Sequence, residues 1–196
     1  MCNHYHNIPE ALPTIESWRE FVSHFNYDDP PSDMYPKRQG VVVRMHEGET
    51  VAETMHWGFP WIGKGKRPGT TKKMNTTNVR NHNSPLFRGI INQAQNRCLV
   101  PFTEFAEPRV DERGTEAWFA VLGEKIPAFA GIWRDDAAAG PVFAFLTSAP
   151  NPLVAQIHPK AMPVILHRED YSRWLEGAPA QKLASPFPSQ LMSIVR

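Results

Sequence analysis

The residue with the most reactive chemistry in this sequence is the cysteine at position 2. Cysteine is small enough for the preceding Met1 normally to be removed, and the mature chain then begins with an α-amine and a thiol on one residue. Reference pKa values of about 8 for the amine and about 8.5 for the thiol leave part of each nucleophilic near neutrality. Such a 1,2-aminothiol condenses with an aldehyde to an imine, which the thiol closes to a thiazolidine in a favourable intramolecular step. Cysteine also occurs at this position by chance, so Cys2 alone does not decide the function.

Cys2, His4 and His6 form a C-x-H-x-H cluster that offers a second, metal-binding interpretation. Alternate side chains of an extended segment share a face, so three ligands could converge there. No second ligand group at metal spacing appears elsewhere, and a metal would silence the aminothiol. We therefore expect no metal and no other cofactor. Cys98 lies in a strand-like apolar run and is expected to be a buried, inert thiol in a reducing compartment.

Three further segments hold polar residues where a plain core strand would not. Asn78 and Arg80 are two positions apart and point the same way if extended, so they offer an amide and a phosphate-binding guanidinium. Glu107 closes an apolar strand as a partly desolvated carboxylate, and His158 precedes a proline-rich turn, where it suits a general acid or base. Each of these residues, taken singly, is more often structural than catalytic.

Positive charge is concentrated in one part of the chain. The fifty residues between Glu53 and Glu104 contain no acid, and the formal net charge of the whole chain is only +1. Such segregation produces a basic face that attracts polyanions. Aromatic rings and a proline directly before the basic segment, Trp57, Pro60 and Trp61, suit stacked bases of single-stranded nucleic acid, although Trp57 is equally well a core residue. The cations of this window are Lys64, Lys66, Arg67, Lys72, Lys73, Arg80, Arg88 and Arg97.

The elements that must position these residues are mostly short strands. A 3.6-residue period predicts a helix capped by Thr14, a second capped by Ser84, and a third over residues 168–175. The stretch from Gly63 to Thr77 is expected to be a long mobile loop. We expect an α+β fold, in which one domain over residues 1–196 has mainly antiparallel sheets, a barrel-like β core and a few peripheral helices. The predicted strands cover residues 40–45, 51–57, 98–107, 117–122, 128–134, 142–147, 162–166 and 191–195.

Composition indicates an ordinary folded protein. The 196 residues are 41% hydrophobic and 21% charged, which excludes a disordered or fibrous chain. No apolar run approaches the roughly 18 residues of a membrane span, and the N-terminus is too polar for a signal peptide. We therefore expect a cytoplasmic monomer that does not associate with a membrane.

Taken together and in order, the motifs resemble the SOS-response-associated peptidase (SRAP) family over residues 2 to 166. Each motif is common by itself, whereas the ordered set is specific. The matching segments are Met-Cys at the start, Trp57-Gly58, Asn78-Val79-Arg80-Asn81, Ser84-Pro85 with Phe87-Arg88, Arg97 to Pro101 ending at Glu107, Phe129 to Trp133, and Ile157 to Leu166.

The resemblance implies that the chain forms covalent crosslinks to abasic sites in single-stranded DNA. Met1 would be removed, by the protein's own peptidase activity, and Cys2 would capture the ring-opened aldehyde as a thiazolidine. Asn78 would position the Cys2 amine, Glu107 would assist proton transfer there and in Met1 removal, and His158 would shuttle a proton. The resemblance also implies a nucleoid-associated protein of the cytoplasm. Implied DNA contacts are Arg80 and Arg88 on phosphates, Trp57, Pro60 and Trp61 against bases, and Lys72 and Lys73 as part of an electrostatic funnel.

The sequence departs from the family pattern at several of these positions. Val79 replaces the usual alanine. Asn75 competes with Asn78 for the same role, and we choose Asn78 because an arginine follows it at the right spacing. Glu107 lacks its usual aromatic flanks, and His4 stands where an arginine is common. Two other classes of function stay open, an N-terminal-nucleophile amidohydrolase and a non-catalytic single-strand-binding domain.

Overall fold

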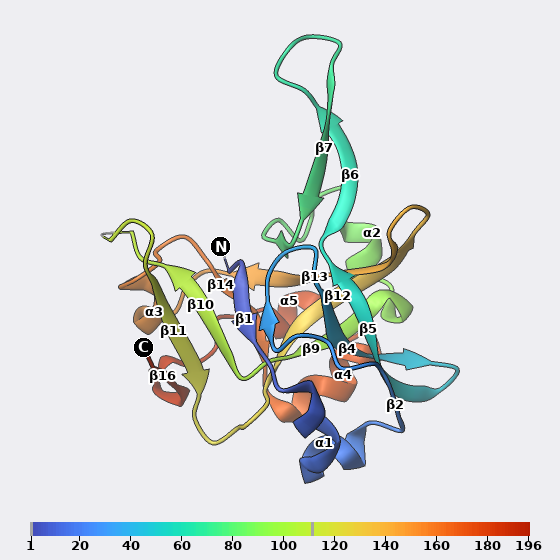
Figure 1. The fold of residues 1–196 in the computed structure, drawn as a ribbon, viewed down its shortest axis with the longest axis vertical. Helices are drawn as coiled ribbons and strands as arrows, with labels where there is room; N and C mark the ends of the chain where they lie inside the picture. Colours follow the sequence, from blue (N-terminus) through green and yellow to red (C-terminus); the bar gives the residue numbers. More distant parts are fainter. Residues whose placement is uncertain (1, 111) are drawn as a thin grey trace.

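The computed structural model describes residues 2–110 and 112–196, which form a five-stranded sheet, a nine-stranded sheet and a separate two-stranded hairpin, with short helices around them (Figure 1). Every strand pair of the first sheet is antiparallel, and so are most pairs of the second. The predicted α+β class with mainly antiparallel sheets is therefore confirmed. No helix within the described residues is long and apolar enough to cross a membrane.

The first sheet contains the N-terminal strand between two partners. Its strand order is β16-β11-β10-β1-β3, so β1 lies between β10 and the edge strand β3. The register pairs His4 with Ala106 of β10, and His6 with both Glu104 of β10 and Asp33 of β3. The strands of this sheet are β1 (His4–His6), β3 (Asp33–Met34), β10 (Glu104–Pro108), β11 (Glu116–Val121) and β16 (Met192–Ile194).

The second sheet is larger and forms the centre of the molecule. Its main path runs β14-β13-β12-β9-β4-β5-β2, with β15 paired to β12 and β8 paired in parallel to β13. Its strands are β2 (His24–Asn26), β4 (Gln39–His46), β5 (Glu49–Trp57), β8 (Asn78–Val79), β9 (Arg97–Pro101), β12 (Ala128–Asp136), β13 (Gly140–Ser148), β14 (Met162–Pro163) and β15 (Ile165–Leu166).

The central sheet is buried on both faces because its side chains alternate between two cores. On β13, Phe143 and Phe145 pack toward the first sheet, whereas Val142 and Ala144 pack toward the helices. Aromatic rings thus fill the space between the sheets, and smaller residues meet the helical layer. The helical segments are η1 (Pro9–Thr14), α1 (Glu16–Phe21), α2 (Arg88–Ile91), η2 (Ala94–Asn96), α3 (Pro152–Ala155), η3 (Arg168–Asp170), α4 (Tyr171–Leu175), α5 (Ala180–Leu183) and η4 (Ser189–Leu191).

The expected loop over residues 63–77 is wrong, because most of this stretch is a β-hairpin. Strands β6 (Phe59–Lys64) and β7 (Thr71–Thr76) pair antiparallel, and the hairpin rises well away from the body (Figure 1). The hairpin is held by the backbone hydrogen bonds between its two strands, and most of its side chains are not buried. Its sequence is therefore polar, like that of a loop. At its base Gly58 has φ +123°, and a Cβ there would lie 2.2 Å from the Asn75 amide nitrogen, so only glycine fits.

Helix boundaries differ most from the sequence predictions. Thr14 does not cap α1, because its hydroxyl donates to the Ala11 carbonyl and the helix begins after Ile15. The helix expected from Ser84 is reduced to the short α2. The helix expected over residues 168–175 is present as η3 followed by α4. The predicted strand over residues 98–107 is divided into β9 and β10, which belong to different sheets.

Candidate active site around Cys2

Cys2 lies two residues before His4, the first residue of β1, and is completely buried between the two sheets. Its thiol donates a hydrogen bond of 3.4 Å to the carbonyl of His4. Burial, followed by the nearby charge of Glu107, raises the pKa of the Cys2 thiol well above the ordinary value. The thiol of this state is therefore protonated at neutral pH and is not a ready-made thiolate nucleophile.

Asn78 holds the backbone of Cys2. Strand β8 carries Asn78 and pairs in parallel with β13, which brings the buried amide to the N-terminal segment. The Asn78 Nδ2 donates to the Cys2 carbonyl at 2.7 Å and to Thr77 Oγ1 at 2.9 Å. The competing candidate, Asn75, lies on the exposed strand β7 opposite Pro60. Asn78 is thus the asparagine beside Cys2.

A buried carboxylate faces the other side of Cys2. Glu107, on β10, is completely buried and accepts a hydrogen bond from the backbone amide of Cys2. Burial is the main cause that raises the pKa of Glu107 to about 7. Glu107 can therefore take up or release a proton near neutral pH, directly beside the nitrogen that becomes the amine when Met1 is removed.

His158 completes this group of residues. It follows α3, whose first turn is capped by the side chain of Asn151, and its Nε2 lies 3.8 Å from the Glu107 carboxylate. Burial lowers the pKa of His158, which favours the neutral imidazole. A neutral imidazole and a carboxyl with a pKa near 7 can exchange a proton. The structure therefore places Cys2, Asn78, Glu107 and His158 close together, and their catalytic roles stay predictions.

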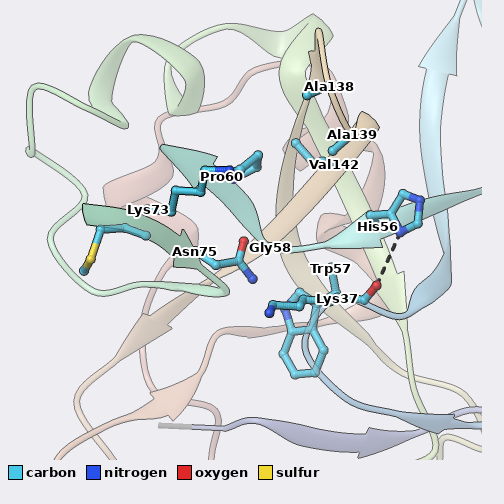
Figure 2. A pocket seen from close by; sticks show the side chains of 11 residues that line it. Lys37, His56, Trp57, Gly58, Pro60, Lys73, Asn75, Ala138, Ala139 and Val142 are labelled. Carbon is cyan, nitrogen blue, oxygen red and sulfur yellow. Dashed lines mark hydrogen bonds between the residues drawn. The ribbon is translucent and has the colours of Figure 1, made fainter. Parts of the chain in front are cut away.

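A cavity of about 500 Å³ lies at the base of the hairpin (Figure 2). Trp57 lines the cavity and donates from its indole to the Thr77 carbonyl at 3.1 Å, directly before Asn78. Cys2 itself is not among the lining residues, so the cavity neighbours the site through Trp57 and Thr77. The lining residues are Lys37, His56, Trp57, Gly58, Pro60, Lys73, Met74, Asn75, Ala138, Ala139 and Val142.

Comparison with known families identifies the chain. The model of the SOS response associated peptidase (SRAP) family matches residues 1–196. The chain belongs to the SRAP family. It is thus an SOS-associated, peptidase-like protein, whereas no curated protein matches it.

Solved structures share the SRAP fold with this chain. A protein from Bordetella bronchiseptica is 27% identical with a TM-score of 0.75, and each chain is covered to 100%. A protein from Bacteroides thetaiotaomicron is 21% identical with a TM-score of 0.74, covering 100% of this chain and 92% of its own. A phage-related protein from Bordetella bronchiseptica is 18% identical with a TM-score of 0.65, with 100% and 93% covered. The latter two show the fold alone.

The residues predicted to contact DNA differ in their exposure to solvent in this SRAP protein. The ring of Trp57 is completely buried, stacked on Phe143 and Phe145, so it cannot offer a face to a base as predicted. The strand alternation that makes Trp57 part of the core decides its position. Pro60 and Trp61 are partly exposed on β6, whereas Lys72, Lys73, Arg80 and Arg88 are exposed.

Sequence reasoning missed several neighbours of the site. Lys37 and His56 line the same cavity as Lys73. Neither residue stands in a recognisable motif, so no sequence signal pointed to them. The alternative ligand set of Cys2, His4 and His6 does not form, because the two imidazoles gather with Asp33 and not with the thiol. Asp33 lies on the neighbouring strand β3, so only the strand pairing could have revealed it.

Proposed function

We propose that this protein captures abasic sites in single-stranded DNA as a covalent thiazolidine on Cys2, after Met1 has been removed. Met1 lies outside the described residues. The observation that carries the proposal is the environment of the Cys2 backbone, which is held by Asn78 at its carbonyl and by Glu107 at its nitrogen. Glu107 thus contacts the nitrogen that becomes the N-terminal amine, and Asn78 contacts the carbonyl of the same residue.

The chemistry begins at the amine and ends at the thiol. The Cys2 amine attacks the aldehyde of the ring-opened sugar, and loss of one water molecule gives an imine. The thiol then adds to the imine carbon, a carbon–sulfur bond forms, and the thiol proton ends on the nitrogen. The raised pKa of the buried thiol keeps it protonated beforehand, which fits a reaction in which the amine acts first.

Glu107 and His158 supply the proton transfers of this sequence. Water loss from the carbinolamine needs a proton on the departing oxygen, and the amine must lose one. A carboxyl group with a pKa of about 7 can serve in both directions near neutrality. His158, 3.8 Å from Glu107, is close enough to relay that proton toward the sugar. Glu107 is also the residue best placed to assist removal of Met1.

The basic surface supplies affinity for the strand. Lys64, Lys66, Arg67, Lys72 and Lys73 belong to the hairpin or its turn, which projects from the body (Figure 1). Cations on such an arm attract the phosphate backbone irrespective of base sequence. The cavity at the base of the hairpin, with Lys37, His56 and Lys73 in its wall (Figure 2), offers space for a nucleotide beside the site.

Crosslinking to a defined oligonucleotide tests the proposal. Tag-free protein is incubated with single-stranded DNA that carries one abasic site, and a band that survives denaturing electrophoresis is expected. Cys2→Ala should abolish the band, whereas the matched Cys98→Ala should leave it unchanged. Raising the salt concentration should slow the wild-type reaction because it screens the basic hairpin.

Two results would contradict the proposal. One is a crosslink of equal yield in Cys2→Ala, and the other is a retained Met1, seen by intact mass, in protein that crosslinks normally. An amidohydrolase would instead turn over small amides without DNA. A simple strand-binding domain would bind the oligonucleotide equally well with and without the lesion.

A further inference from the structure

A second cluster of ligand-type side chains lies beside the N-terminal strand, and it does not use the thiol of Cys2. His4 and His6 alternate along β1 and therefore project on the same side, where β3 presents Asp33. The Nε2 atoms of His4 and His6 lie 2.5 Å and 2.9 Å from Asp33 Oδ1. Within the described residues, these three ligand atoms all lie within 4.8 Å of one another.

His4 is clamped between two carboxylates. Its Nδ1 lies 2.8 Å from Glu116 Oε2, while its Nε2 faces Asp33. A neutral imidazole carries only one N–H, so one of its nitrogens would turn a lone pair toward a carboxylate oxygen. A cation on that nitrogen, either a second proton or a metal ion, removes the repulsion. His4 is 7% exposed, and its ring stacks on Tyr35 with centroids 4.0 Å apart, which fixes the orientation of the ring.

We propose that His4 Nε2, His6 Nε2 and Asp33 Oδ1 bind one divalent transition-metal ion of the zinc type. Two imidazoles and a carboxylate are ligands that zinc accepts, and a water molecule would fill the fourth position. Glu116 then accepts a hydrogen bond from His4 Nδ1, which is the outer carboxylate that commonly supports a metal-bound histidine. The Asp33 side chain is 45% exposed, so the ion can enter from solvent.

The present distances are hydrogen-bond lengths, and they must widen when the ion enters. Zinc bonds of about 2.1 Å in a tetrahedron separate neighbouring ligand atoms by about 3.4 Å. Asp33 can make this adjustment because it lies on the two-residue edge strand β3 and is partly exposed. Its carboxylate needs to withdraw by less than about 1 Å from each imidazole.

The second imidazole also has an outer carboxylate. An Arg196 side-chain nitrogen lies 3.1 Å from His6 Nδ1, and because arginine only donates, Nε2 carries the proton that faces Asp33. Metal binding at Nε2 moves this proton to Nδ1, where Glu104, 3.8 Å away, can accept it. The Arg196 side chain is 54% exposed, so it can move away from His6 into solvent.

The site goes beyond the proposed crosslinking function, and its expected effect is structural. An ion shared by β1 and β3 would tie the strand that follows Cys2 to the sheet edge. The ion would leave the Cys2 thiol free, in contrast to a cluster of Cys2, His4 and His6. Metal binding should therefore raise the thermal stability of the protein without requiring crosslinking chemistry.

Calorimetric titration of tag-free protein with Zn²⁺ tests the site. All measurements use a Cys2→Ser background, because a processed Cys2 would itself chelate zinc through its amine and thiol, and because this variant cannot crosslink. We expect one equivalent of Zn²⁺ to bind and the melting temperature to rise. Asp33→Asn and His6→Gln should each weaken binding at least 10-fold, whereas the exposed His46→Gln should bind as the background does.

Circular dichroism and thermal unfolding without metal verify that each variant is folded, and Co²⁺ absorption in the visible range gives a second readout of the ligand set. A tetrahedral cobalt spectrum that disappears in His6→Gln supports the site. The proposal is overturned if Zn²⁺ does not bind the Cys2→Ser protein, or if Asp33→Asn and His6→Gln bind it as tightly as that background. Either result would leave His4 held only by its hydrogen bonds to Asp33 and Glu116.

Discussion

Cys2 and Cys98 are both completely buried, and burial raises the pKa of both thiols well above the ordinary value. Their surroundings differ. Cys98 lies in the middle of the central sheet, where β9 pairs with β12 and β4, and its sulfur would touch a Cβ placed on Gly131. Cys2 lies outside the strands, two residues before β1, where Asn78 and Glu107 contact its backbone.

Burial alone therefore does not distinguish the cysteine that we propose to react from the one that we expect to be inert. A buried carboxylate is costly unless something compensates it, and structures place such groups mainly where chemistry needs them. A completely buried carboxyl group, Glu107, lies beside Cys2, whereas Cys98 lies among apolar side chains. The comparison therefore predicts that substitutions around Cys2 change reactivity, while substitutions around Cys98 change stability.

The largest expected effect is on crosslinking in Glu107→Gln. The amide keeps the shape of the carboxyl group but cannot exchange protons, so the crosslinking rate at pH 7 should fall about 10²- to 10³-fold, as is typical for general acid–base groups. Single-turnover kinetics on abasic single-stranded DNA measure the rate from pH 5 to pH 9. The wild-type profile should change slope near pH 7, the pKa of Glu107, and the variant should lack that change.

The control for this experiment is Glu112→Gln, a change at an exposed carboxylate between β10 and β11. It should react at the wild-type rate. An equal pH profile in wild type and Glu107→Gln would show that another group performs the proton transfer. The distinction between the surroundings of Cys2 and those of Cys98 would then rest on Asn78 alone.

The sequence was sufficient to predict the fold class, and its resemblance to the SRAP family named residues that lie around Cys2, whose catalytic roles stay predictions. Regular strands such as β12 and β13 are predictable because their alternating apolar residues pack on both faces of one sheet. Asn78, Glu107 and His158 were found through motifs. The arrangement of these residues in space depends on the pairing of β1 with β10 and of β8 with β13, which no local pattern specifies.

Other features could not be predicted for physical reasons that particular residues illustrate. The β6–β7 hairpin has too few buried side chains to show a strand pattern, so residues 63–77 resembled a loop. Asp33 and Glu116 reach His4 from 29 and 112 positions away, and only the assembled sheet brings them together. Trp57 followed an aromatic pattern that suits DNA, but its place in β5 turns the ring inward.

A second prediction concerns the dependence of stability on pH. Glu107 binds its proton more tightly in the folded protein, with a pKa of about 7, than in the unfolded chain, with a pKa near 4.5. The free energy of unfolding therefore falls as the pH rises from about 4.5 to about 7 and stays at the lower value above pH 7. Glu107→Gln lacks this loss. Between pH 4.5 and pH 8 the variant should gain about 3 kcal/mol relative to wild type.

Urea unfolding at pH 4.5, 6 and 8 measures this difference, on preparations whose N-termini are shown by intact mass to be the same. His158 has a lowered pKa and contributes the opposite trend below about pH 6.5, but it is present in both proteins and largely cancels. Parallel stability curves for wild type and variant would mean that Glu107 is already ionised in the folded state. The site would then hold a carboxylate and not a proton carrier.

The smallest effect is expected at Cys98, and it has the opposite character. Cys98→Ser changes one atom and places a hydroxyl among apolar side chains, beside a glycine whose missing Cβ leaves just enough room for the sulfur. Burying a hydroxyl there should lower the free energy of unfolding by about 1–3 kcal/mol, measured by urea unfolding at pH 7. Crosslinking at a temperature where the variant is folded should match that of wild type, because Cys98 contacts none of Asn78, Glu107 and His158 in the hydrogen bonds of the described residues. A Cys98→Ser protein that is as stable as wild type but crosslinks slowly would reverse the comparison. The crosslinking rate would then depend on the thiol of Cys98 as well as on Cys2.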